Sequence, residues 1–307
     1  YDPYVNLLRS ATEAMSAALG GADSIHVSDF SEAFRPSDDF SARIARNQQI
    51  ILKEESFFNR IVDPAAGSYY IENLTANLAG EAWKLFLDTE SKGGFAACYE
   101  KGLVQDKIAE CAAKRNADLA KRKIVLTGVN QFPNLNEQEA ENIRSTAREF
   151  AKEGDFKTIR PYRAAQAFEE LRLQTEAFAK KNGRRPKVFL LTCGNLAMRK
   201  ARAGFATNFF GCLGYEIVDN AGFKDGEEGA KAALESKAEI TVLCSSDEEY
   251  AALAAQACPL LKGKTHIVYA GAAQDEEPFR ALGVECFIHV RSNVLETLRS
   301  FQQSLMK

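Results

Sequence analysis

The sequence has few residues of the types that bind metal ions. It holds three histidines and seven cysteines in 307 residues, and no two cysteines form a C-x-x-C pair. Scattered cysteines of this kind exclude a zinc finger and a disulfide-stapled secreted scaffold. Several lie in apolar runs, where cysteine behaves as a small buried hydrophobe. A reducing cytoplasm is therefore the expected compartment.

Long hydrophobic runs and a strong excess of one charge are also missing. No apolar run approaches the ~20 residues needed to span a bilayer, so we expect no membrane segment. The formal net charge is −3, which does not favour the concentrated basic face that nucleic acid requires. The basic cluster 180–185 is interpreted as a solvated linker. Because the chain opens at Tyr1 without methionine or a signal peptide, we expect a fragment of a longer domain.

The length predicts about two domains, and residues 186–307 carry the clearer pattern. Five apolar runs are typical of buried parallel strands: 188–191, 215–218, 240–244, 266–269 and 286–290. Helical stretches alternate with them: 197–213, 226–236, 248–261, 276–282 and 294–305. This alternation predicts an α/β, doubly wound parallel sheet of the flavodoxin-like kind. Ligands bind at the carboxyl ends of such strands, so the candidate ligand segments are 192–196, 245–247 and 270–273.

The first 133 residues are richer in helices than in strands. Helical periodicity covers 6–19, 40–54, 74–89 and 104–121, whereas strands are expected only at 24–27 and 123–127. Asp38 or Asp39 is placed to cap the second helix. Since so few strands do not close a core, we expect part of a larger domain. Residues 134–185 are rich in Glu, Ala and Arg, and this composition predicts a helical linker arm.

Candidate catalytic residues are sparse. His26 lies six residues before Glu32 at the end of an expected strand, where such a pair could polarise a carbonyl or shuttle a proton. The more ordinary interpretation is a hydrogen-bonded histidine in a loop. Cys193 lies at a strand-to-helix turn but has no histidine near it in sequence, so we do not expect a nucleophile. Residues 245–247 are expected to cap the following helix.

Several motifs together resemble the methylmalonyl-CoA mutase family. They are Ser24-Ile-His26, Phe40-Ser-Ala-Arg-Ile-Ala-Arg-Asn47, Asp63-Pro-Ala-Ala-Gly-Ser-Tyr-Tyr70, Glu81-Ala-Trp83, Gly93-Gly94 and Gly128-Val-Asn130. The resemblance covers essentially the whole chain. It implies that residues 1–133 are the C-terminal end of a (β/α)8 TIM barrel with flanking helices. It also implies that residues 134–185 are the linker arm and 186–307 a flavodoxin-like domain of the cobalamin-binding type.

One part of the family pattern is missing. Catalytic chains of this family carry Asp-x-His-x-x-Gly after the first strand of the cobalamin domain, and this histidine is the lower cobalt ligand. Here Arg199 stands at about the histidine's position, and arginine cannot be deprotonated to ligate a metal. We therefore predict no catalytic residue, no metal ligand and no bound cobalamin in this chain. His26 and Glu32 remain positional matches to a loop near the adenosyl group.

The segments 203–208, 244–250 and 160–172 resemble the small, non-catalytic beta subunit of the two-chain bacterial enzymes. That resemblance implies a cytoplasmic heterodimer with a large catalytic subunit, active in propionate metabolism. The holoenzyme would interconvert methylmalonyl-CoA and succinyl-CoA by a radical rearrangement with adenosylcobalamin. Two alternatives stay open. One is a catalytically active mutase chain that binds cobalamin without a histidine ligand, and the other is a module that binds a different small molecule in the cofactor cleft.

Overall fold

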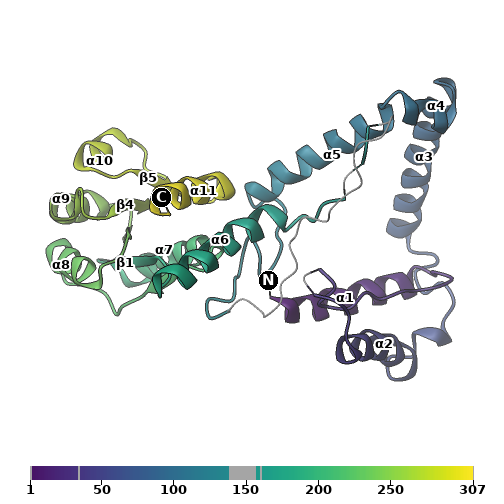
Figure 1. Cartoon of the computed structure of the whole chain (residues 1–307), viewed down its shortest axis with the longest axis horizontal. Coiled ribbons are helices and arrows are strands. Elements are labelled where there is room, and N and C mark those ends of the chain that lie inside the picture. The colour runs from purple at the N-terminus through teal and green to yellow at the C-terminus, as the bar shows by residue number, and fades with distance from the viewer. Residues whose placement is uncertain (1, 34, 138–156, 160, 307) are drawn as a thin grey trace. The chain divides into compact units, whose positions relative to one another are not determined.

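The computed structural model describes residues 2–33, 35–137, 157–159 and 161–306. Contacts divide the chain into two compact units (Figure 1). The first comprises residues 115–139 and 163–307, and the second comprises residues 2–114 and 140–162. No helix in the described ranges combines the length and the apolarity that crossing a membrane requires.

The first unit is built on a five-stranded parallel sheet with the order β2-β1-β3-β4-β5. Its strands are β1 (Lys187–Thr192), β2 (Glu216–Val218), β3 (Ile240–Cys244), β4 (His266–Ala270) and β5 (Cys286–Ile288). All five predicted strands are confirmed within a few residues. β2 lies on one side of β1 and β3 lies on the other, so the direction in which the chain adds strands to the sheet reverses at β1. In α/β sheets, ligands bind at such a reversal.

Helices cover both faces of this sheet. They are α6 (Gln166–Asn182), α7 (Leu196–Gly211), α8 (Gly226–Ser236), α9 (Tyr250–Leu261), α10 (Glu277–Leu282) and α11 (Val294–Leu305). Alternate residues of β1 enter different cores: Val188 packs with Phe209 and Phe210 of α7, whereas Phe189 packs against the α8 and α9 side. Burial on both faces explains why these strands read as continuous apolar runs.

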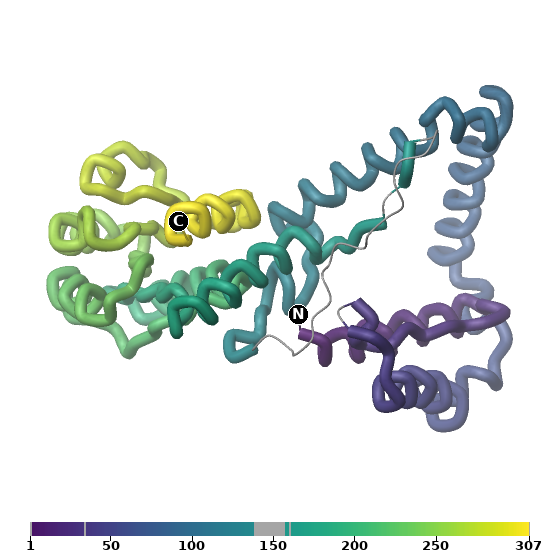
Figure 2. The backbone as a smooth tube through the Cα atoms, in the orientation of Figure 1, coloured from purple at the N-terminus to yellow at the C-terminus, as the bar shows by residue number. Residues whose placement is uncertain are grey.

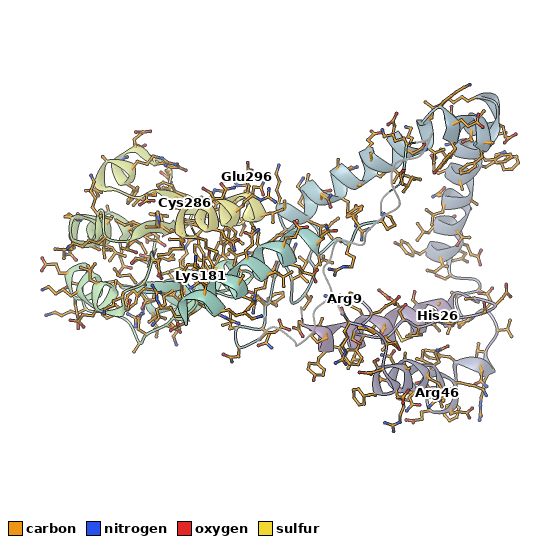
Figure 3. All side chains as sticks on the ribbon, viewed as in Figure 1. Arg9, His26, Arg46, Lys181, Cys286 and Glu296 are labelled. Carbon is orange, nitrogen blue, oxygen red and sulfur yellow. The ribbon has the colours of Figure 1, made fainter. Side chains whose placement is uncertain are left out.

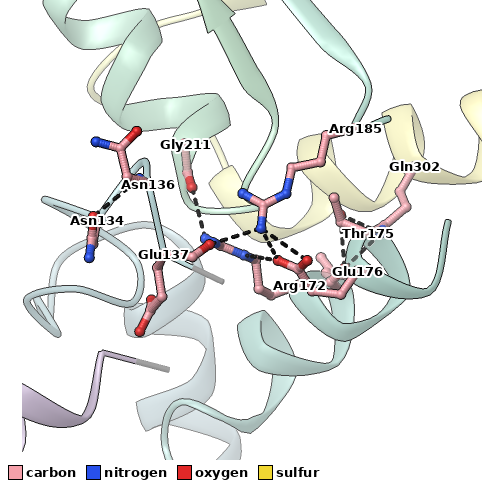
Figure 4. A network of polar contacts seen from close by, with 10 residues as sticks. Asn134, Asn136, Glu137, Arg172, Thr175, Glu176, Arg185, Gly211 and Gln302 are labelled. Atoms are coloured by element: carbon pink, nitrogen blue, oxygen red, sulfur yellow. Dashed lines mark hydrogen bonds and ion pairs between the residues drawn. The ribbon is translucent and has the colours of Figure 1, made fainter. Parts of the chain in front are cut away.

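A buried polar network fixes α6 to this unit (Figure 4). Arg172 donates to Glu176 at 3.2 Å, and Arg185 donates to both oxygens of the same carboxylate at 2.7 and 3.0 Å. Both arginines also donate to the Glu137 carbonyl. On the other side of α6, Gln302 of α11 donates to the Leu171 carbonyl at 2.7 Å. The buried carboxylate is thus fully paired, as a charge inside a protein must be.

The second unit is helical in its described part. Its elements are α1 (Pro3–Leu19), α2 (Asp39–Glu54), the short 3-10 helix Phe58–Arg60, α3 (Tyr69–Ser91), α4 (Gly94–Glu100) and the first part of α5 (Leu103–Ala120). The α1 and α2 helices are joined by Gln48, which donates to Ser10 and to the Leu7 carbonyl. Asp38 caps α2 by accepting from Ser41 N at 2.7 Å, as predicted.

Two predicted strands are wrong. Residues 24–27 form no strand, and residues 123–127 contribute only the isolated bridge Thr127–Gln131. Asn130 explains the second case, because its side chain accepts from Leu126 N at 2.7 Å and donates to the Ile124 carbonyl at 2.9 Å. One amide thereby satisfies backbone groups that a neighbouring strand would otherwise pair.

Helix boundaries also differ from expectation. The long helix starts at Tyr69 and not at residue 74, because the turn before it ends at Ser68. In the linker arm, α6 confirms the helical periodicity, while residues 138–156 and 160 lie outside the described part. No strand is described before Lys187. The barrel and the domain boundaries at 133 and 185 therefore stay predictions.

Candidate ligand edge of the parallel sheet

The carboxyl ends of β1, β2, β3 and β4 meet at one edge of the sheet, here called the ligand edge. It consists of residues 193–195, 219–222, 245–249 and 271–273. All three segments predicted from the sequence lie here, because carboxyl ends of parallel strands share an edge.

The turn after β1 places a glycine beside a helix N-terminus. Gly194 has φ +78°, a backbone conformation that residues other than glycine rarely adopt. Asn195 caps α7 by accepting from Ala197 N and Met198 N at 3.1 Å each. Cys193 is half-buried, and this burial raises the pKa of its thiol. A raised pKa disfavours the thiolate, so Cys193 does not fit the role of a nucleophile.

Glu249 fills the space over this turn. Its Oε2 accepts from Asn195 N at 2.9 Å, from Ser246 Oγ at 2.7 Å and from Ser245 Oγ at 3.2 Å. The Asn195 amide and then the Ser246 hydroxyl hold the pKa of this carboxyl below its usual value of 4.5. The carboxylate lies so close to Gly194 that an added Cβ would clash with it. The chain's own anion thus occupies the place where a ligand oxygen would be held.

The expected cap formed by residues 245–247 is wrong. The α9 helix begins at Tyr250, its N-cap residue is Glu249, and no side chain caps it. The serine hydroxyls donate to the Glu249 carboxylate, while the backbone N–H groups of Glu249 and Tyr250 bond the Ser246 carbonyl.

Arg199 joins the turns after β1 and β2. Its guanidinium donates to the Gly194 carbonyl at 3.3 Å and to the Ala221 carbonyl at 2.9 Å. It also covers Gly222, which has φ +105° and where an added Cβ would stand 2.5 Å from the guanidinium carbon. Arg199 therefore closes the ligand edge on the β2 side.

Arg202 covers the third glycine of the edge. It donates to Asp247 Oδ1 at 2.8 Å, and its guanidinium carbon stands 3.4 Å from a Cβ built on Gly271. A charged side chain of the chain itself therefore lies over a glycine in the turns that follow β1, β2 and β4.

The ligand edge does not fit a histidine-ligated cobalt. Within the described ranges, no group of three or more His, Cys, Asp or Glu side chains is placed to hold a metal ion. His266 begins β4, at the opposite end of the strand, where it bonds Glu285 at 2.6 Å. His289 follows β5 and accepts from Arg291 N. The position where the family motif would place a histidine holds Arg199, already bound to two carbonyls.

His26 and Glu32 are not brought together. Both are exposed on the segment between α1 and α2, and no hydrogen bond or ion pair of the described residues joins them. Figure 3 labels His26 on this segment. Sequence reasoning missed Glu249. Its signal was present as Ser246-Asp-Glu-Glu249, the S/T-x-x-E spacing in which a glutamate reaches back to a serine.

A family model described as "Methylmalonyl-CoA mutase" matches residues 1–202. A protein of Porphyromonas gingivalis named "Methylmalonyl-CoA mutase small subunit" is 50% identical over 98% of this chain and 48% of its own length. A protein of the same name from Streptomyces virginiae is 40% identical over 88% of this chain and 43% of its own.

A "Methylmalonyl-CoA mutase" from Cereibacter sphaeroides is 30% identical over 86% of this chain and 46% of its own length. The chain thus spans about half the length of the curated relatives it matches. A family match across residues 1–202 and 50% identity over nearly the whole chain leave one assignment: the chain belongs to the methylmalonyl-CoA mutase family.

Proposed function

We propose that this chain belongs to the small subunit of a methylmalonyl-CoA mutase and serves the reaction without holding the cofactor. The large subunit would bind adenosylcobalamin and interconvert methylmalonyl-CoA and succinyl-CoA, and this chain would stabilise it as a heterodimer. The relatives named as small subunits support the role. In this proposal residues 186–307 are a flavodoxin-like domain of the cobalamin-binding type, and residues 1–133 are the end of a TIM barrel. Residues 134–185 link the two.

One observation carries the non-catalytic part of the proposal. Glu249 and Arg199, both from the chain itself, cover Gly194 and Gly222 at the point where the strand order reverses. A ligand there would have to displace the Glu249 carboxylate from three donors and break two hydrogen bonds of Arg199. Each of these hydrogen bonds involves a charged group, and a ligand would have to replace all of them, so displacement is unfavourable.

A titration with adenosylcobalamin tests the proposal. We expect the visible spectrum of the cofactor to stay unchanged as the chain is added, and the colour to separate from the protein on gel filtration. A stable coloured complex would instead support the alternative of an active mutase chain that binds cobalamin without histidine.

The partner is tested separately with the large subunit. We expect the two chains to co-elute as a 1:1 complex. If they elute apart at micromolar concentration, the role of a stabilising subunit is wrong, whatever the cofactor titration shows.

A further inference from the structure

A polar cavity lies in the first unit beside the amino ends of β4 and β5, and therefore away from the ligand edge. It has a volume of about 400 Å³ and is lined by His266 of β4, by Glu285 and Cys286 at the start of β5, and by one face of α11. Figure 3 labels Cys286, and these segments form the yellow-green to yellow part of the backbone in Figure 2. A volume near the lower limit of small-molecule sites predicts a small ligand.

The α11 helix presents three hydroxyl groups and one aromatic ring to this cavity. Thr297, Ser300 and Ser304 follow one another at spacings of three and four residues, so they lie on the same side of the helix. Phe301 is buried on that side, and its ring makes a T-shaped contact with the His266 imidazole, with the centroids 5.9 Å apart. This contact packs the imidazole against α11.

His266 connects a carboxylate to a hydroxyl. Its Nδ1 lies 2.6 Å from Glu285 Oε2, and its Nε2 lies 3.2 Å from Ser304 Oγ. Because a carboxylate only accepts hydrogen bonds, Nδ1 of the neutral imidazole carries the proton and donates it. Nε2 then has a free lone pair and accepts from the Ser304 hydroxyl. This order of groups is that of a Ser-His-acid triad, in which the imidazole takes the proton of the serine.

Ser304 is the nucleophile that this arrangement activates. Hydroxyl side chains in helices commonly donate to a carbonyl three or four residues earlier, as those of Ser10 and Thr12 do. The Ser304 hydroxyl is directed to the imidazole instead. Cys286 also lines the cavity, but burial raises the pKa of its thiol to about 11, which keeps it protonated at neutral pH.

The lining residues also restrict the substrate. Backbone N–H groups within a helix are already bonded, and those of His266 and Glu285 donate to backbone carbonyls. Among the lining residues, the hydroxyls of Thr297 and Ser300 are therefore the donors that remain for an oxyanion. Since hydroxyls stabilise an oxyanion less than a preorganised pair of N–H groups does, the substrate needs a leaving group that departs as a stable anion. The carboxylates of Glu285 and Glu296 disfavour an anionic substrate.

We propose that Ser304, His266 and Glu285 form a hydrolytic triad for short, uncharged carboxylic esters with a good leaving group. Ser304 Oγ attacks the ester carbonyl carbon while its proton passes to His266 Nε2. The bond from the carbonyl carbon to the leaving oxygen then breaks, and His266 returns the proton to that oxygen. Water, deprotonated by His266, cleaves the acyl–serine ester, releases the carboxylic acid and restores the serine hydroxyl. Glu285 is a positioning residue that holds Nδ1 and stabilises the imidazolium.

This activity is separate from the mutase reaction, so its test does not depend on the proposed function. Hydrolysis of p-nitrophenyl acetate by the chain is followed through the absorbance of p-nitrophenolate. We expect Ser304→Ala to lower the rate above the buffer blank at least about hundredfold, as loss of an activated nucleophile does. The control His289→Gln, outside the cavity lining, should leave the rate unchanged. Equal rates for the unmodified chain and Ser304→Ala would overturn the proposal, and so would a rate equal to the blank.

Mass spectrometry of acid-quenched samples identifies the acylated residue. We expect an acetyl group on the peptide that contains Ser304 in the unmodified chain, and its absence from that peptide in Ser304→Ala. Acetylation confined to other peptides would overturn the assignment of the nucleophile. Circular dichroism verifies that each variant is folded.

The role of Glu285 is tested by splitting kcat from KM. Glu285→Gln keeps an oxygen that accepts from Nδ1 but removes the charge that stabilises the imidazolium. We expect kcat to fall at least about tenfold and KM to change less than about twofold, because the charge acts only in the transition state. A variant with unchanged kcat would show that Glu285 is not part of the triad.

Discussion

Glu249 is the residue on which the ligand edge depends most. A carboxylate whose pKa is lowered on folding adds stability above the unfolded pKa of about 4.5, and this stability is lost as the pH falls below that value. We therefore expect Glu249→Gln to lower the melting temperature at pH 7, and the difference from the unmodified chain to become smaller at pH 3, because protonation of Glu249 removes the advantage of its charge. Thermal unfolding followed by circular dichroism at both pH values measures this.

The neighbouring Glu248 provides the matched control, because it is exposed and lies next to Glu249 in the same loop. Glu248→Gln should melt like the unmodified chain at pH 7. If both variants lower the melting temperature by the same amount, then the removal of a negative charge explains the effect and the hydrogen bonds to Glu249 do not.

Gly194 tests how closely that carboxylate packs. Gly194 and Gly183 both have positive φ, +78° and +70°, but a Cβ meets nothing within 4 Å at Gly183. Gly183→Ala should therefore cost only the left-handed strain, about 1–2 kcal/mol. Gly194→Ala should cost more than Gly183→Ala, because its Cβ would push the Glu249 carboxylate away from its hydrogen-bond donors.

Urea unfolding of both glycine variants measures the difference. Adding Glu249→Ala to Gly194→Ala should remove most of the excess cost, since the clashing group is then gone. An undiminished cost in the double variant would mean that the clash is with another group.

A buried carboxylate, Glu176, holds helix α6 against the rest of its unit. Glu176 has 8% of its side chain exposed and receives hydrogen bonds from Arg172 and Arg185. Glu176→Gln should lower the free energy of unfolding by about 3 kcal/mol, because it leaves two guanidinium groups without their anion.

Denaturant unfolding gives this free energy, and Glu170→Gln provides the control on the same helix. Glu170 is exposed and accepts a hydrogen bond from Gln166, so Glu170→Gln should change stability by less than about 0.5 kcal/mol. Equal effects of the two variants would contradict a special role of the buried pair.

The strands show what sequence patterns can and cannot predict. β1, β3 and β4 were predictable because burial on both faces requires a continuous apolar run, which is visible in one segment alone. Residues 123–127 have similar composition, yet they pair with no strand because the side chain of Asn130 takes their hydrogen bonds. A strand is a property of two segments, and one segment does not reveal its partner.

The ligand edge was predictable to a similar degree. Its position follows from the order of strands and helices, and the absence of the motif's histidine can be seen in the sequence. The occupation of the edge by Glu249 was not predicted, because its amide partner Asn195 lies 54 residues away. Contacts between such distant residues depend on how the loops after β1 and β3 lie in the folded protein. Hydrophobic periodicity predicts the strands and helices but not the positions of these loops.

Burial is uneven between the two units of the chain. The first unit has two large cores on either side of its sheet, whereas in the described part of residues 2–114 the buried apolar residues are Ala14, Phe30, Ala45 and Cys98. Amide exchange should therefore be slow in β1, β3 and β4 and fast along α3. Hydrogen-exchange mass spectrometry of the isolated chain measures this, and slow exchange along α3 would contradict its exposure.

The hydrogen bonds of Gln302 have a kinetic consequence. They connect α11 to Leu171 and Thr175, 131 and 127 residues earlier. Contacts between such distant positions form late, because closing a long loop is entropically costly before other contacts compensate for it. A nascent chain on the ribosome can assemble β1 to β4 as they emerge, but α6 gains its partner Gln302 only after α11 has been translated.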